Sequence, residues 1–129
     1  MYYDYSNMNQ SIEKIFDEYK IIFKSKQDYI NIQIQKNNHL DVFESKFNLK
    51  YLHKYKLLMG NLSIDEMIEF MNELIDSKRI KIEEYENNLK LILISTIKSY
   101  PNVELILNEK NIIEKLINEI EGMKMKINY

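Results

Sequence analysis

The spacing of the apolar residues changes twice along this chain, and no other feature of the sequence restricts the fold as strongly. Ile30, Ile32 and Ile34 alternate with polar residues, which predicts a strand with one buried face. Through residues 48–77 the apolar positions instead recur every three or four residues, which predicts helices, and alternation then returns. We therefore predict an α+β fold in which a helical hairpin, residues 48–77, is inserted between the strands of an antiparallel sheet or small sandwich.

The segment before this hairpin is expected to contain one helix and three strands. Residues 9–19 place apolar side chains at helical spacing, which predicts a short amphipathic N-terminal helix. Turn-like segments, KSKQD and KNNH, separate the alternating runs that follow, and this indicates a three-stranded antiparallel meander. The apolar positions that define the three strands are Tyr19, Ile21, Phe23, Ile30, Ile32, Ile34, Leu40, Val42 and Phe43.

The helical hairpin carries clear start signals. Asn48 is suited to cap the first helix, whose apolar face is expected at Leu49, Leu52, Tyr55, and Leu58 or Met59. The second helix begins at LSIDEM, where Ser63 is the N-cap, Glu66 its capping-box partner, and Leu62 can pack on Met67 as a hydrophobic staple. Its apolar stripe consists of Ile64, Met67, Ile68, Met71, Leu74 and Ile75.

The segment after the hairpin is expected to form three further strands and a last helix. Asn87 and Asn88 tolerate the left-handed backbone of a tight turn, so they predict a β-hairpin between the runs that begin at Ile80 and Leu89. A third strand runs from Val103, and Asn111 then repeats the capping pattern with a glutamate three residues on. We accordingly divide the chain into a head, residues 1–110, and a C-terminal helix, residues 111–129.

The C-terminal helix has the spacing of a coiled coil. Three isoleucines fall at a positions and leucine or methionine at d positions, a combination that favours a parallel two-stranded coil. The pattern predicts a homodimer whose contact residues are Ile113, Leu116, Ile120, Met123, Ile127, Glu119 and Lys124. Ile112, Ile117 and Met125 widen the apolar stripe, however, and a wide stripe also suits a helix that packs on its own sheet. Both arrangements stay open.

Composition narrows the chemistry available to the chain. Hydrophobic residues make up 45% and charged residues 29% of 129 residues, which suits one packed domain. The absence of cysteine excludes disulfides and thiolate sites, and two glycines are too few for a phosphate-binding loop. The two histidines, His39 and His53, have no carboxylate at helical spacing. We expect no catalytic residues, cofactor or metal; an enzyme with a site around His39 or His53 is the minor alternative.

Charge and hydropathy also argue against nucleic acid and membrane as partners. The net charge is −2, which gives no basic footprint. The predicted helix 64–77 carries five acidic side chains, which would be repelled by phosphates, so we expect no nucleic-acid binding through it. No apolar run approaches the roughly 18 residues that span a bilayer, and the N-terminus lacks the pattern of a secretory signal. We therefore expect a cytoplasmic or other intracellular location.

The order of elements resembles a superfamily that includes the end-joining scaffold protein that partners DNA ligase and the centriole cartwheel protein. The matching parts are NLKYLHKYKLLMGNLSIDEMIEFMNELIDSK, the strands on either side of it, and NIIEKLINEIEGMKMKI. The resemblance rests on pattern, so it carries over no functional residue. It implies a small β head with an inserted helix-turn-helix and a C-terminal helix that dimerises as a stalk. It also implies scaffolding, in some members with head-to-head polymerisation.

Two functions follow from these observations. The first is a non-enzymatic scaffold or assembly module that dimerises through its C-terminal helix and has room for other protein partners. The alternative is a monomeric protein-binding domain or an accessory subunit of a larger complex, in which the last helix packs within the chain or on an unrelated partner.

Overall fold

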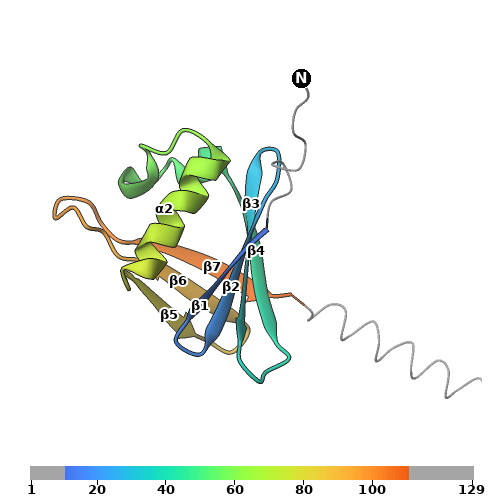
Figure 1. Cartoon of the computed structure of the whole chain (residues 1–129). Coiled ribbons are helices and arrows are strands. Elements are labelled where there is room, and N and C mark those ends of the chain that lie inside the picture. Colours follow the sequence, from blue (N-terminus) through green and yellow to red (C-terminus); the bar gives the residue numbers. More distant parts are fainter. Residues whose placement is uncertain (1–10, 111–129) are drawn as a thin grey trace, which may run out of the picture.

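A computed structural model describes residues 11–110 of the chain. Seven strands form a single antiparallel sheet in the order β1-β2-β3-β4-β7-β6-β5 (Figure 1). Helix α2 (Ile64–Asp76) is the one long helix of the described residues, and a single helical turn, α1 (Leu49–Leu52), and a 3-10 turn, η2 (Lys56–Leu58), precede it. The strands are β1 (Ser11–Phe16), β2 (Tyr19–Ser25), β3 (Tyr29–Lys36), β4 (Val42–Asn48), β5 (Ile80–Glu84), β6 (Asn88–Leu93) and β7 (Val103–Glu109).

The sheet consists of two groups of strands that meet at a short joint. Strands β1 to β4 follow one another as a meander, and β5 to β7 form the second group. The groups are joined where β4 pairs with β7, and the pairing there covers Phe43 with Glu109 and Glu44 with Asn108. Beyond this joint the groups splay apart, so the sheet curls into a half-barrel, and α2 lies on its concave side between them (Figure 1).

The core lies between the concave face of the sheet and α2. Alternate residues of β2, β3, β6 and β7 point inward, which is why the period-two pattern of these segments is so regular. The predicted stripe of α2 is confirmed, because all six of its apolar residues are buried. The fully buried side chains of largest volume are Phe23, Ile21, Ile30, Ile32, Ile34, Leu52, Leu58, Met67, Met71, Leu89, Leu91 and Leu93.

The capping predicted at the N-terminus of α2 is confirmed in part, and its C-terminus has a cap of its own. Ser63 Oγ accepts a hydrogen bond from the Glu66 amide at 3.1 Å, which confirms the predicted N-cap. Leu62 is 74% exposed, so it is not the buried staple that we expected. At the other end Lys78 has a φ of 59°, and the Arg79 amide donates to the Leu74 carbonyl at 2.7 Å. These are features of a Schellman cap, here formed without glycine.

The predicted N-terminal helix is wrong, because residues 11–16 form strand β1. β1 pairs with β2 through a turn at Asp17 and Glu18, and Asp17 adopts the left-handed φ of 52° that aspartate tolerates. Ile12 and Phe16 lie opposite Phe23 and Tyr19 of the inner face, and both are half-buried. The pairing with β2 therefore outweighs the local helical spacing.

The helical hairpin and the predicted α+β class are also corrected. Asn48 caps a helix, as expected, since its Oδ1 accepts from the Tyr51 amide at 2.7 Å. That helix ends after Leu52, however, and successive turns carry the chain to α2. β4 extends to Asn48, whereas Leu40 lies outside any strand and is 89% exposed. The described fold is thus mainly one antiparallel sheet, not a sandwich, and the expected C-terminal coiled-coil helix lies outside the described residues and forms no part of it.

Candidate interaction surfaces

The predicted dimer contact lies wholly outside the described residues. All seven residues named for it, Ile113 to Ile127, fall within residues 111–129, so their role stays a prediction. The described fold does fix where this segment begins. The Lys110 amide donates to the Val42 carbonyl at 2.7 Å, so the chain leaves the sheet beside the start of β4, at the joint between the two groups of strands.

Among residues 11–110, neither histidine is brought together with other titratable groups to form a site. His53 Nε2 lies 2.7 Å from the Asn61 carbonyl oxygen, a contact that ties the turns before α2 together. His39 is exposed in the loop before β4, and its own carbonyl accepts from Gln35 Nε2 at 2.7 Å. Within residues 11–110, no group of three histidine, aspartate or glutamate side chains is arranged to hold a metal ion.

A surface pocket of about 440 Å³ lies at the N-terminus of α2. The loop after β2 forms one wall, and α1 and the first turn of α2 form the other. Leu49, Leu62 and Ile64 give the pocket an apolar lining, while Ser63 already uses its hydroxyl to cap α2. The pocket therefore combines an apolar wall with the polar and charged residues Lys26, Gln27 and Asp28 of the loop after β2.

An aromatic cluster lies on the turns between β4 and α2. The rings of Phe47, Tyr51 and Tyr55 follow one another at centroid distances of 5.7 and 5.9 Å. The hydroxyl groups of Tyr51 and Tyr55 lie 3.2 Å apart, and Lys54 Nζ lies 5.1 Å from the Tyr51 ring. The hydrogen bond between the Tyr55 and Tyr51 hydroxyls, together with burial, raises the pKa of Tyr55 to about 12. This cluster presents Tyr51 partly to solvent, as interface tyrosines often are.

A polar cluster draws the end of β5 toward β2 and β3. Lys36 Nζ lies 3.1 Å from Glu18 Oε1 and 3.4 Å from Glu84 Oε2. Hydrogen bonds to Glu18 and Glu84 raise the pKa of Lys36. Burial and then a hydrogen bond to Glu84 raise the pKa of Tyr19 to about 12. Both groups keep their ordinary charge at neutral pH, and the contact between Lys36 and Glu84 links the end of β3 to the end of β5.

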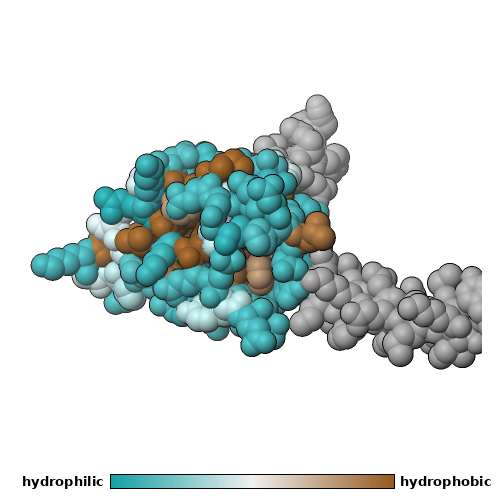
Figure 2. All heavy atoms as spheres, turned by 90° about the horizontal axis from the view of Figure 1, so that it is seen from below, coloured by the Kyte–Doolittle hydropathy of each residue, from teal (hydrophilic) through white to brown (hydrophobic). Residues whose placement is uncertain are grey.

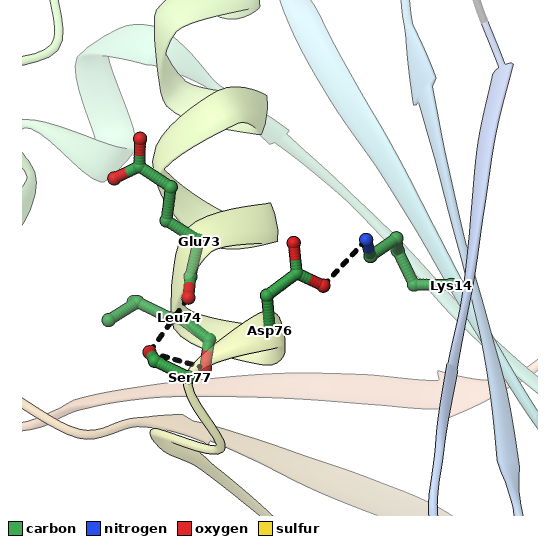
Figure 3. Close-up of polar contacts among 5 residues, drawn as sticks. All are labelled: Lys14, Glu73, Leu74, Asp76 and Ser77. Atoms are coloured by element: carbon green, nitrogen blue, oxygen red, sulfur yellow. Dashed lines mark hydrogen bonds and ion pairs between the residues drawn. The ribbon is translucent and has the colours of Figure 1, made fainter.

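One ion pair attaches α2 to the edge strand β1. Lys14 Nζ lies 2.6 Å from Asp76 Oδ1, at the last turn of the helix (Figure 3). Beside it, Ser77 Oγ donates to the carbonyls of Glu73 at 2.7 Å and Leu74 at 3.3 Å (Figure 3). The exposed face of α2 stays acidic. That it does not bind nucleic acid remains a prediction.

Apolar atoms are spread thinly over the described surface. Viewed from below, teal atoms cover most of it and brown atoms form small separate patches (Figure 2). No helix of residues 11–110 is both long enough and apolar enough to cross a membrane. The exposed large apolar residues are Ile15, Leu40, Tyr51, Met59, Leu62, Tyr85, Ile97 and Ile106.

Comparisons with known proteins connect the chain to a head domain through its fold. No model of a known protein family matches the sequence, and neither does any curated protein. Among solved structures, the fold is similar to the head domain of human CCDC61, with a TM-score of 0.57 and 9% sequence identity. The similarity covers 79% of this chain and 96% of that chain. At 9% identity, this similarity shows the fold alone. It supports the expected head only as an architecture.

Proposed function

We propose that this chain is the non-enzymatic head module of an intracellular protein scaffold and that it dimerises through residues 111–129. The observation that carries the proposal is the fold similarity to a head domain over 96% of that chain. The means of association is the apolar pattern at Ile113, Leu116, Ile120, Met123 and Ile127, with the opposite charges of Glu119 and Lys124 beside it.

The geometry of the described residues suits this arrangement. Lys110 is fixed to β4 by its backbone, and Lys110 Nζ lies 4.0 Å from Glu44 Oε2. The C-terminal segment therefore starts from an anchored point at the middle of the sheet rather than from a frayed strand end. Two chains joined through this segment would carry their pockets at α2 on separate heads, so that each head remains available to a partner.

Analytical ultracentrifugation of the chain and of an Ile120→Asp variant tests the dimer. We expect the parent chain to sediment as a dimer or larger at micromolar concentration, and Ile120→Asp to weaken this association because it buries a charge in the apolar contact. Asn118→Asp adds the same charge at an outward heptad position and should leave the association unchanged. A parent chain that is monomeric at high micromolar concentration contradicts the proposal.

The apolar pocket favours the second candidate, a monomeric protein-binding domain or accessory subunit. Its lining by Leu49, Leu62 and Ile64 provides a place for a partner's side chain without any self-association. On this hypothesis the parent chain, Ile120→Asp and Asn118→Asp all sediment as monomers. The same sedimentation series therefore separates the two candidates.

A further inference from the structure

The pocket at the N-terminus of α2 lies next to the point where the described chain begins. Ser11 is the first residue of β1, and it pairs with Lys24 of β2. The next residue of β2, Ser25, already lines the pocket together with Lys26 and Gln27 of the loop that follows. Because β1 and β2 are antiparallel, a continuation of β1 before Ser11 would run past these lining residues. The first ten residues of the chain therefore join the fold beside the pocket.

The alternation of side chains along β1 indicates which of these residues is suited to the pocket. Ile12 and Phe16 pack on the core, so every second side chain of β1 faces the concave side of the sheet. The same alternation, continued beyond Ser11, would place Met8 on the concave side as well. Methionine is apolar, unbranched and flexible, so its side chain adapts to a pocket of irregular shape.

We propose that residues 1–10 of the same chain cover this pocket and that Met8 is the side chain that occupies it. The register of β1 on β2, continued beyond Ser11, puts Met8 opposite Gln27, which lines the pocket. Leu62 lines the other wall and is 74% exposed. Contact with Met8 removes this apolar side chain from water, which is the main gain in free energy from covering the pocket.

Reach, charge and tethering favour a segment of the same chain over a separate partner. Met8 lies three residues before Ser11, and an extended chain covers about 3.3 Å per residue, so Met8 reaches about 10 Å beyond β1. This length is comparable with the width of a pocket of about 440 Å³. Residues 1–10 carry one charged side chain, Asp4, so covering the pocket buries little charge. A short tether also gives the segment an effective concentration of about 1 mM.

The contact controls access to the pocket. A partner that inserts a side chain beside Leu49 and Leu62 must first displace Met8, so its apparent affinity falls with the fraction of chains whose pocket is uncovered. This goes beyond the association proposed for residues 111–129. It does not depend on that association, because the contact is made within one chain.

Oxidation of methionine by hydrogen peroxide tests the contact in the full chain. Oxidation to the sulfoxide follows the exposure of the sulfur, and peptide mass spectrometry measures each methionine separately. Met59 is 54% exposed and serves as the exposed reference in the same molecule, while Met71 is 0% exposed and reports that the core stays folded. We expect Met8 to be oxidised roughly fivefold more slowly than Met59, at a rate that does not change with protein concentration.

Leu62→Gln is the informative variant. It replaces an exposed lining residue with a polar one of similar size and leaves the Ser63 cap of α2 in place, so Met8 loses its apolar contact without loss of the fold. Oxidation of Met8 should then approach the rate of Met59. Leu40→Gln makes the same change in the loop at the far end of β3, at a residue that is 89% exposed, and should leave the rate at Met8 unchanged.

Several results would overturn the proposal. Equal oxidation of Met8 and Met59 in the parent chain shows that Met8 is not packed. Slow oxidation of Met8 that Leu62→Gln leaves unchanged, or that Leu40→Gln accelerates equally, shows that Met8 is protected somewhere other than the pocket. Protection that grows with protein concentration assigns the contact to a second copy of the chain. The comparison of Met8 with Met59 in the parent chain stays decisive even if oxidation of Met71 shows that a variant has unfolded.

Discussion

Truncation of Met71 tests whether α2 holds the two groups of strands together. Met71 lies in the middle of α2 and is 0% exposed, within the core between the helix and the concave face of the sheet. Alanine is at least as good a helix former as methionine, so Met71→Ala leaves the helix itself intact. The loss is one of packing, and buried methionine-to-alanine changes cost about 2–5 kcal/mol.

Urea unfolding followed by circular dichroism measures this cost. With a slope of about 1–3 kcal/mol per molar urea, Met71→Ala should lower the midpoint by roughly 1–2 M. Glu69→Ala, on the exposed face of the same helix, is the control and should change the free energy of unfolding by less than about 0.5 kcal/mol. If the two variants lose the same small amount, α2 does not fill the space between the strand groups and the fold argument fails.

Three smaller effects should be measurable by the same means. Lys14→Gln should cost no more than about 1 kcal/mol, and less at high salt, because its partner Asp76 is largely exposed. Ser63→Ala should cost about 1 kcal/mol, since it removes the N-cap acceptor of α2; no change in urea midpoint would contradict that role. The pKa values of Tyr19 and Tyr55 are raised from 10.0 to about 12, so the stability they provide is complete below pH 10 and lost toward pH 12. Tyrosinate absorbance at the ordinary pH in folded protein would refute this.

The parts of the fold that sequence reasoning found are those with complete local signals. β3 shows strict alternation from Ile30 to Ile34, and α2 shows a cap at Ser63 followed by a regular apolar stripe. In both, a window of a dozen residues contains all the information, because neighbours in sequence share one environment. The β-hairpin between β5 and β6 is also confirmed, but Asn88 already belongs to β6, and neither Asn87 nor Asn88 has the left-handed backbone on which the prediction rested.

The errors arise where a distant residue decides the local structure. Lys14 faces inward from β1 and interrupts the apolar alternation between Ile12 and Phe16, so the segment does not read as a strand. Its inward position is explained by Asp76, which lies far away in sequence. Similarly, Leu49, Leu52 and Leu58 have helical spacing, yet no continuous helix carries them: Leu49 and Leu52 lie in the single turn α1, and Leu58 lies in the 3-10 turn η2. Tertiary packing, not periodicity, set those conformations.

The pocket at the N-terminus of α2 shows the same division. Its lining residues Leu49, Leu62 and Ile64 are present in the sequence, but the pocket needs the loop after β2 to lie beside the helix, which no local pattern indicates.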